Sequence, residues 1–386
     1  GEPIEVREHQ INAFVHAMQS RRTLLVSPTA SGKSLIIYLI FRQLLDYQKL
    51  KGLIIVPTTS LVEQLYADFE DYSTVNNWSV KDHCQKLYSG FTKEFTKDVL
   101  ITTWQSVYLQ PKSWFKQFDV IFGDEAHQFK AKSLTTIMEK LDNIGYRVGT
   151  TGTLDNKKIH RLVLEGIFGP VHKVTSTRQL MNSGRLSDLN ITCIVLKYSE
   201  VIRKERNKNT YQEEMDWLVS HYPRNKFIRN LAVNSKGNTL VLFQYVEKHG
   251  KVLYDMIKEK VHDGRKVFFV YGGTDTSDRE AIRHITEGED DAIIIASYGT
   301  FSTGINIPSI ENVVFASPSK SKIRNLQSIG RGLRKKDGKS ACNLYDLADD
   351  LHWKSWKNHT LNHAAERYKT YAEEEFDVKL IEVEVC

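Results

Sequence analysis

Short apolar runs alternate along the chain with longer segments in which apolar residues recur every three or four positions. A continuously apolar run of about four to eight residues is typical of a strand buried on both faces, whereas the longer spacing predicts an amphipathic helix. In the first half of the chain this pattern predicts strands at 23–26, 53–56, 99–101, 120–122 and 147–149. Strands that alternate with helices in this way predict a parallel α/β sheet covered on both faces.

The pattern restarts near residue 187 and predicts a second parallel α/β sheet of similar size. Helical spacing then continues through a tail from residue 351 to residue 375. Because 386 residues exceed one ordinary hydrophobic core, we expect two domains, 1–186 and 187–350, with a helical extension at 351–386 packed on the second. The strands of the second sheet are expected at 190–196, 239–243, 266–270, 292–296, 313–316 and 341–345.

The composition is that of a globular protein, with 41% hydrophobic and 26% charged residues, and no apolar run approaches the ~20 residues of a membrane span. The net charge of +6 permits a polyanionic partner without requiring one. The chain starts with Gly1 rather than Met and shows no signal peptide, so we expect natural sequence to precede Gly1. Four cysteines far apart along the chain predict reduced thiols in the cytoplasm rather than a zinc site or disulfides.

Residues 27–34, Ser-Pro-Thr-Ala-Ser-Gly-Lys-Ser, lie between the first predicted strand and a predicted helix. This order of strand, small-residue loop, Gly-Lys-Ser and helix is typical of a phosphate-binding P-loop. Lys33 would reach the β- and γ-phosphates, and the Ser34 hydroxyl would hold Mg²⁺. Ser27 stands where a first glycine is usual, and a chance Gly-Lys-Ser at a helix start is the alternative. The expected phosphate-binding residues are Thr29, Ala30, Ser31, Gly32, Lys33 and Ser34.

Two carboxylates, Asp124 and Glu125, directly follow the fourth predicted strand, 91 residues (124 − 33) beyond Lys33. This position is typical of a Walker B aspartate. Asp124 would hold Mg²⁺, and Glu125 would take the proton from the attacking water. The alternative is that Asp124 caps the N-terminus of a helix.

Polar residues also follow other predicted strands of the first half, at 57–60, 102–106 and 150–153. Ligands of open α/β sheets bind at the carboxyl edge, so we expect these segments to share one edge with the P-loop. Ahead of the first strand, Arg7 and Gln10 open a helix. They could recognise the polar edge of an adenine or simply start a solvated helix.

The second half contains no Gly-Lys-Ser, so only the first predicted domain has a phosphate loop. Residues 327–334 place Gln327, Arg331 and Arg334 on one face if they are helical. Two aligned arginines suit a fixed cationic contact with phosphate. A basic solvated helix or an RNA-binding stripe is the alternative.

In their order along the chain, these segments resemble the motif set of the superfamily 2 helicases of DEAH type. The resemblance covers residues 7–334, nearly the whole chain. No single motif is specific for this family, but eight motifs in the family's order are. The segments are Arg7 with Gln10 (Q-type motif), 31–34 (motif I), 57–59 (Ia), 102–103 (Ib), Asp124-Glu125-Ala126-His127 (II), 151–153 (III), 302–306 (V) and 327–334 (VI).

The resemblance implies two tandem RecA-like domains that hydrolyse ATP with Mg²⁺ as they close and reopen. It implies a monomer that acts without sequence preference on branched DNA, single-stranded DNA or RNA–DNA hybrids, and a small further domain upstream. The implied catalytic residues are Lys33, Glu125, Gln327, Arg331 and Arg334. The implied nucleotide-binding residues beyond the P-loop are Arg7, Gln10, Asp124, His127, Gly304 and Asn306, with Ser34 and Asp124 as metal ligands. The implied nucleic-acid-binding residues are Pro57, Thr58, Thr102, Thr103 and Thr303.

Other functions are compatible with part of this motif set. A restriction-type translocase on double-stranded DNA and an RNA-specific DEAH helicase would share them. A GTP switch needs an N-K-x-D guanine-binding motif, and residues 156–159, Asn-Lys-Lys-Ile, lack its Asp. A non-catalytic nucleic-acid clamp would not need Lys33, Glu125 and Arg334.

Overall fold

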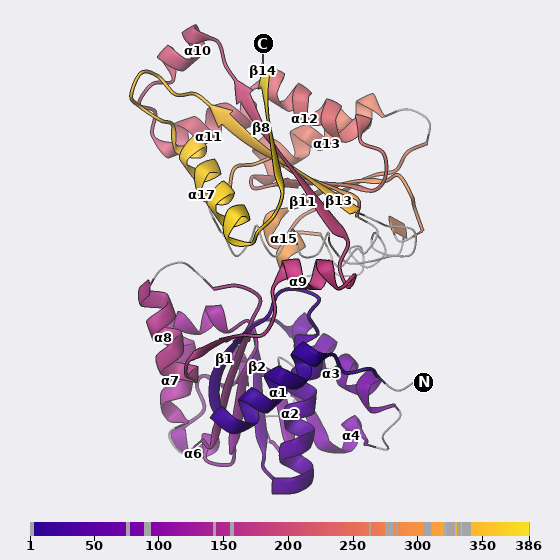
Figure 1. The fold of residues 1–386 in the computed structure, drawn as a ribbon, viewed down its shortest axis with the longest axis vertical. Coiled ribbons are helices and arrows are strands. Elements are labelled where there is room, and N and C mark those ends of the chain that lie inside the picture. Colours follow the sequence, from indigo (N-terminus) through magenta and orange to yellow (C-terminus); the bar gives the residue numbers. More distant parts are fainter. Residues whose placement is uncertain are drawn as a thin grey trace. The chain divides into compact units, whose positions relative to one another are not determined.

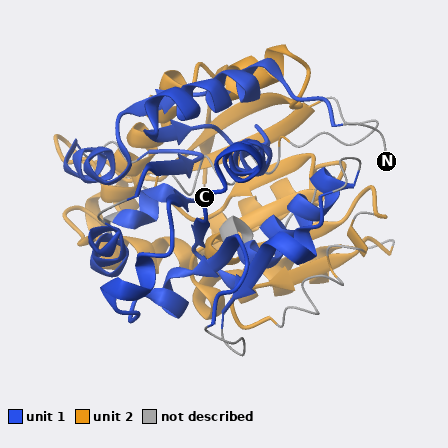
Figure 2. Cartoon of the chain, turned by 90° about the horizontal axis from the view of Figure 1, so that it is seen from below, with its two compact units in different colours: residues 1–176 blue, residues 177–386 orange. Residues whose placement is uncertain are grey.

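The computed structural model of the chain describes residues 4–74, 78–88, 94–141, 144–154, 158–261, 264–274, 282, 285–286, 288–303, 310–319, 321, 329, 333 and 341–385. The chain divides into two compact units, residues 1–176 and residues 177–386, which Figure 2 draws in blue and orange. The first unit ends ten residues (186 − 176) ahead of the boundary expected from the sequence. The second unit includes the expected extension from residue 351 onward.

A seven-stranded parallel sheet forms the centre of the first unit, with strand order β3-β4-β2-β5-β6-β1-β7. The carboxyl ends of its strands therefore share one edge. The sequence pattern did not predict β3 and β7, because Cys-Gln-Lys-Leu and Val-His-Lys are too short and too polar to form apolar runs. The strands are β1 (Arg22–Val26), β2 (Gly52–Val56), β3 (Cys84–Leu87), β4 (Val99–Thr103), β5 (Val120–Gly123), β6 (Tyr146–Thr151) and β7 (Val171–Lys173).

Helices cover both faces of this sheet, and each face has its own hydrophobic core (Figure 1). Leu25 and Ile54 pack with α1, α2 and α3 on one face. Their neighbours Leu24 and Leu53 pack with η1, α7 and α8 on the other. Successive residues of a strand point to opposite faces, so a sheet covered twice needs continuously apolar strands. The helices are α1 (Glu8–Ser20), α2 (Lys33–Gln48), α3 (Thr59–Ser73), α4 (Val80–His83), α5 (Trp104–Val107), α6 (Lys112–Phe115), the 3₁₀-helix η1 (Ala126–Lys130), α7 (Lys132–Lys140) and α8 (Lys158–Phe168).

The second unit contains another seven-stranded parallel sheet, with strand order β10-β11-β9-β12-β13-β8-β14. When its strands are numbered from β8 as the first, this is the same order as in the first unit, position by position. The predicted fold class of two tandem parallel α/β domains is confirmed. The strands are β8 (Asp188–Lys197), β9 (Thr239–Phe243), β10 (Val267–Val270), β11 (Ile293–Ser297), β12 (Asn312–Phe315), β13 (Ala341–Asp350) and β14 (Val378–Glu384).

The C-terminal tail contributes both a helix and an edge strand to the second unit. Helix α17 places Ala364 against Val195 and Ala348 of the sheet. The strand β14 pairs in parallel with β8, in a tail for which the sequence pattern predicts only helix. The helices of this unit are α9 (Thr177–Asn182), α10 (Glu200–Glu205), α11 (Tyr211–Ser220), α12 (Tyr222–Asn234), the π-helix η2 (Val246–Gly250), α13 (Lys251–Lys260), α15 (Tyr298–Thr303) and α17 (His359–Glu373).

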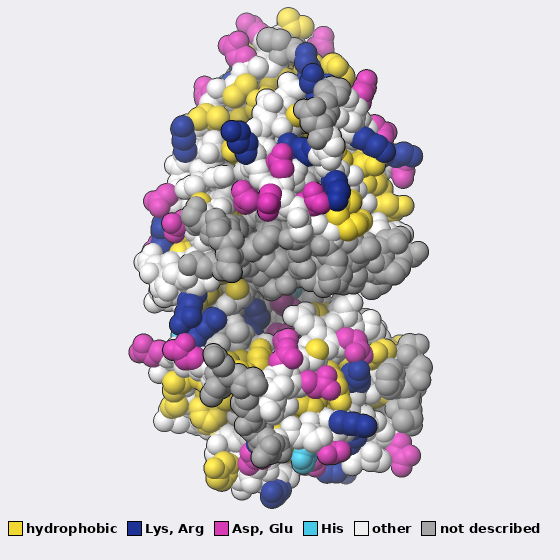
Figure 3. Space-filling view, turned by 90° about the vertical axis from the view of Figure 1, so that its right-hand side faces the viewer, with side chains coloured by type: hydrophobic (Ala, Val, Ile, Leu, Met, Phe, Trp, Pro, Cys, Tyr) yellow, Lys and Arg dark blue, Asp and Glu magenta, His cyan; other side chains and the backbone are white. Residues whose placement is uncertain are grey.

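One face of the molecule carries side chains of both charges. On the face drawn in Figure 3, Lys and Arg side chains are interspersed with Asp and Glu, and the described residues form no continuous basic surface there. Across the described part of the chain, no helix is long and apolar enough to cross a membrane.

Candidate nucleotide-binding site

The loop between β1 and α2 is held by hydrogen bonds of its own hydroxyl groups. Ser27 Oγ donates to Ser31 Oγ at 2.6 Å, and Ser31 Oγ donates to the Pro28 carbonyl at 2.7 Å. Both serines are buried. Ser27, which stands where a first glycine is usual, therefore stabilises the turn through its side chain.

Gly32 is the residue that this loop requires to be a glycine. Its φ of +80° lies in the left-handed region, which disfavours other side chains. A Cβ atom at this position would lie 2.2 Å from Gln10 Nε2. The backbone can therefore pass close to α1 and enter α2 at Lys33, leaving the helix N-terminus available to an anion.

The start of α1 lies against this loop. Gln10, only 2% exposed, donates from Nε2 to the Ser31 carbonyl at 3.0 Å and accepts the Arg7 backbone N–H at 2.9 Å. His9 Nε2 lies 2.9 Å from the same Ser31 carbonyl, and Arg7 Nη1 donates to the Ala30 carbonyl at 3.4 Å. Arg7 and Gln10 thus support the P-loop directly, and their contact with adenine stays a prediction.

Lys33 and Ser34 form the first turn of α2. Lys33 Nζ donates to the Ser27 carbonyl at 3.4 Å and lies beside Gly152 at the end of β6. Ser34 Oγ lies 2.8 Å from the hydroxyl of Tyr72 on α3. The Lys33 amino group therefore lies at the end of β6, the neighbour of β5, whose end carries the carboxylates.

Asp124 follows β5, and Thr150 from β6 donates a hydrogen bond to its Oδ1 at 2.7 Å. Burial raises the pKa of Asp124 and the neighbouring Glu125 raises it further, whereas Lys33 and the Thr150 hydroxyl lower it. The charged groups that act on the pKa of Asp124 are therefore Glu125 and Lys33.

Glu125 has a left-handed backbone with φ of +49°, which few non-glycine residues adopt. Its carboxylate lies 3.3 Å from His127 Nδ1, which in turn lies 3.1 Å from Thr151 Oγ1. Backbone strain of this kind gathers at functional sites, where the surroundings impose it. The predicted segments 124–127 and 151–153 are thereby connected side chain to side chain.

The side chains at this edge suit magnesium with a bound nucleotide rather than a metal held by protein alone. Ser34 and Asp124 offer hard oxygen donors, and Mg²⁺ usually takes one or two such protein ligands together with substrate phosphates and water. The described residues contain no group of three or more His, Cys, Asp or Glu that could hold a metal by itself. The donor set therefore fits a magnesium–nucleotide complex.

Two family models match the chain: Type III restriction enzyme, res subunit, over residues 3–156, and Helicase conserved C-terminal domain over residues 223–336. The ATP-dependent DNA helicase uvsW of Enterobacteria phage T4 is 36% identical over 391 aligned residues, which span 97% of this chain and 76% of that protein. The chain belongs to the superfamily 2 helicases. It is an ATP-dependent helicase and therefore an ATPase, as the motif order predicted.

More distant proteins show how widely the fold of this helicase is shared. The DNA 3'-5' translocase XPB2 of Sulfurisphaera tokodaii is 21% identical, spanning 86% of this chain and 80% of that protein. The structure of the ATP-dependent Type ISP restriction-modification enzyme LlaBIII bound to DNA aligns with a TM-score of 0.71 at 16% identity. It covers 99% of this chain and 32% of that chain. At this identity the likeness shows the fold alone.

The residues predicted to contact nucleic acid have different surroundings. Pro57 and Thr58 are half-buried, and Thr58 Oγ1 caps α3 by accepting the Leu61 N–H at 3.3 Å. Thr102 is fully buried, and its hydroxyl donates to the Leu87 carbonyl at 2.7 Å. Thr103 lies 3.0 Å from Ser106 through their hydroxyls. Thr102 is thus bonded within the sheet, and a phosphate contact by its hydroxyl would require that bond to break.

The predicted residues of the second unit lie outside the described part of the chain. This applies to Gly304, Asn306, Gln327, Arg331 and Arg334, and to the side chain of Thr303. Their roles stay predictions.

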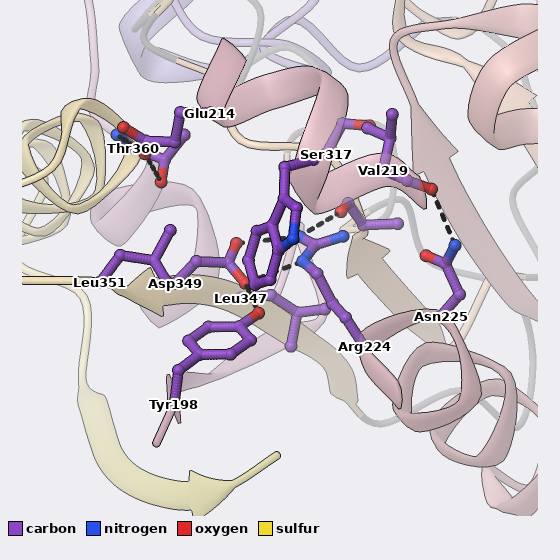
Figure 4. Close-up of polar contacts among 12 residues, drawn as sticks. Tyr198, Glu214, Val219, Arg224, Asn225, Ser317, Leu347, Asp349, Leu351 and Thr360 are labelled. Atoms are coloured by element: carbon purple, nitrogen blue, oxygen red, sulfur yellow. Dashed lines mark hydrogen bonds and ion pairs between the residues drawn. The ribbon is translucent and has the colours of Figure 1, made fainter. Parts of the chain in front are cut away.

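In the second unit, an internal ion pair lies at the strand ends that correspond to the candidate nucleotide site of the first unit. Strands β8, β12 and β13 correspond in sheet order to β1, β5 and β6. Arg224 of α12 donates to Asp349 on β13, to the Ala316 carbonyl after β12, and lies beside Tyr198 after β8 (Figure 4). In the second unit, Arg224 and Asp349 thus lie at the strand ends that correspond to those of β5 and β6.

Three side chains near the site were not assigned a role from the sequence: Ser27 as a brace, Thr150 as the partner of Asp124, and Tyr72 as the partner of Ser34. Thr150 lies next to a predicted motif, so its position at a strand end was a usable signal. Tyr72 lies in a helix 38 residues from Ser34, and nothing in the local pattern distinguishes it.

Proposed function

We propose that this helicase unwinds or branch-migrates branched DNA and RNA–DNA hybrids, with roles in recombination, at replication forks and at R-loops. Opening and closing of two RecA-like domains, driven by ATP, would supply the motion. The DNA substrate is supported by the phage T4 relative, which is named a DNA helicase and resembles this chain over 97% of its length. The proposed activity is sequence-independent and belongs to a monomer.

The nucleotide chemistry is supported by one observation above all: Lys33 Nζ lies beside Gly152 at the end of β6, and Thr150 of the same strand donates a hydrogen bond to Asp124 at 2.7 Å. Ser34 and Asp124 would hold Mg²⁺, which supplies charge neutralisation at the phosphates. Lys33 would bind the β- and γ-phosphates. Glu125 would accept a proton from the attacking water, with His127 orienting its carboxylate.

The second unit would complete this site during closure. We assign Gln327, Arg331 and Arg334 to stabilisation of the γ-phosphate, and Gly304 and Asn306 to nucleotide binding. Arginines placed in this way stabilise the charge that develops during phosphoryl transfer. Hydrolysis would then depend on closure, and the nucleotide would favour the closed state by binding it more tightly.

The nucleic-acid strand would lie against Pro57 and contact the hydroxyls of Thr58 and Thr103 in the first unit and of Thr303 in the second. Contacts of this kind position a strand through its phosphates without reading its sequence. Affinity is therefore expected to fall with rising salt and to be nearly equal for strands of different sequence.

Strand-separation assays on forks, four-way junctions, RNA–DNA hybrids and plain duplexes would test the substrate. We expect ATP-dependent product from branched DNA and hybrids, and none from Lys33→Ala, with the exposed Lys132→Ala as matched control. Triplex displacement without strand separation would favour a restriction-type translocase, and activity on RNA duplexes alone an RNA-specific helicase. DNA binding that never stimulates hydrolysis would indicate a clamp.

A further inference from the structure

The hydroxyl of Tyr72 lies 2.8 Å from Ser34 Oγ, and this contact joins the last turn of α3 to the first turn of α2. Ser34 and Tyr72 are both half-buried. The proposed function gives Ser34 a role at the metal and leaves Tyr72 without one. The Tyr72 hydroxyl therefore lies next to a residue that the proposed function makes a magnesium ligand.

Packing fixes the ring of Tyr72. Its edge lies against Tyr38 of α2, with ring centroids 5.5 Å apart and planes at 61°. Tyr38 is 3% exposed and packs in turn against the fully buried Phe69 of α3. Because residues of two helices pack around the Tyr72 ring, the position of its hydroxyl is fixed.

A serine hydroxyl has one hydrogen and two lone pairs. When one lone pair faces a cation, the hydrogen must point away from it and needs an acceptor. The Tyr72 oxygen is at hydrogen-bond distance from Ser34 to accept that hydrogen. This is the arrangement by which partners behind a metal ligand orient the ligand and strengthen binding.

We propose that Tyr72 is a positioning residue for magnesium: it accepts the Ser34 hydroxyl hydrogen and so turns a Ser34 lone pair toward the metal of the bound nucleotide. The inference rests on the proposed function of Ser34. The opposite arrangement, in which Tyr72 donates to Ser34 and competes with the cation, predicts an effect of opposite sign.

Tyr72→Phe in the full chain tests this directly, because it keeps the ring and removes only the hydroxyl. The measurement is the affinity for a fluorescent ADP analogue with Mg²⁺ and again with EDTA, together with the Mg²⁺ concentration that gives half of the binding increase. We expect the affinity with Mg²⁺ to fall by about 10-fold to 100-fold, while the affinity in EDTA stays as in the unsubstituted chain. Comparing the two conditions on one preparation separates this effect from partial misfolding.

Two further variants sharpen the result. Tyr66→Phe removes a hydroxyl from the same helix, at a ring that lies under Lys86 Nζ at 4.6 Å, and should leave both affinities unchanged. Ser34→Ala should lose the magnesium effect, and adding Tyr72→Phe to it should cause no further loss. Independent losses would mean that Tyr72 does not act through Ser34.

The outcomes separate the inference from the proposal on which it rests. If the unsubstituted chain gains no affinity from Mg²⁺, both are overturned. If it gains affinity and Tyr72→Phe gains as much or more, only the role of Tyr72 is overturned, and a gain beyond the unsubstituted chain would assign Tyr72 to competition with the cation.

Discussion

Arg224 and Asp349 form a fully buried ion pair with two hydrogen bonds, although 125 residues separate them in the sequence. The bonds run from Nε to Oδ1 at 2.8 Å and from Nη2 to Oδ2 at 3.0 Å. Arg224 also donates to the Ala316 carbonyl, and the Tyr198 hydroxyl donates to Asp349 (Figure 4). The pair joins α12 to the carboxyl ends of strands that lie far apart along the chain.

Replacing one partner of this pair should destabilise the second unit strongly. Arg224→Met leaves the Asp349 carboxylate buried without its cation, which typically costs about 3–5 kcal/mol. We expect the second unit to unfold at a lower urea concentration than in the unsubstituted chain. Limited proteolysis in increasing urea measures this transition. Lys266→Met, which breaks the surface pair with Glu289, is the matched control and should shift the transition far less. Equal shifts in the two variants would contradict a special role for the buried pair.

Glu125→Gln should separate nucleotide binding from hydrolysis. The amide keeps the size of the side chain but cannot accept a proton from water, so kcat should fall by about 10²-fold to 10⁴-fold. Affinity for ATP and for DNA should remain near that of the unsubstituted chain. The measurements are DNA-stimulated phosphate release and equilibrium binding of a fluorescent ATP analogue. Glu139→Gln, on the exposed side of α7, is the control; a Glu125→Gln variant that still turns over ATP normally would assign the proton to another group.

The sequence predicted the phosphate loop and its partners because each consists of a few residues at a strand end. Apolar runs fix the strands, and parallel strands bring Lys33 and Asp124 to one edge without further information. The hydrogen bonds that support this loop could not be predicted in this way. Ser27 departs from the glycine pattern, and only its bond to Ser31 explains the departure.

Tertiary packing decides the features that the sequence pattern missed. Arg224 lies in a polar helical segment that predicts an exposed side chain, and only Asp349 across the sheet makes its burial tolerable. The contact of Tyr72 with Ser34 could not be predicted from the local pattern either, because the two residues lie on different helices. In strand β14, Ile381 and Val383 pack against the core of the second unit while Val378 and Leu380 are exposed. The strand forms because β8 offers it an edge.

Arg334→Ala tests whether the second unit completes the site. If Arg334 stabilises the transferring phosphoryl group, its loss should reduce hydrolysis by about 10³-fold or more while ATP still binds. Single-turnover ATP hydrolysis and binding of a non-hydrolysable analogue measure the two properties. Arg161→Ala removes an exposed arginine of α8 that pairs with Glu165, and should change neither. Normal hydrolysis by Arg334→Ala would mean that the proposed two-domain site is wrong.

Asp124→Asn should stabilise the protein while abolishing hydrolysis. Burial, reinforced by Glu125, raises the pKa of Asp124, so the folded chain binds this proton more readily than the unfolded chain. The ionised carboxylate therefore lowers stability at pH values above that raised pKa, and the loss disappears as the pH falls through it. Asparagine removes the charge and can still accept the Thr150 hydrogen bond.

The measurement for Asp124→Asn is the melting temperature without nucleotide from neutral to acidic pH. We expect a higher melting temperature at neutral pH, by roughly 2–4 °C for each kcal/mol gained, with the gain shrinking as the pH falls. Asp71→Asn, on the exposed face of α3, should leave the melting temperature nearly unchanged. A lower melting temperature for Asp124→Asn at neutral pH would show that Lys33 outweighs burial. An ionised Asp124 that costs stability in the empty site, and is kept because a cation and a nucleotide need it, is what a functional carboxylate should show.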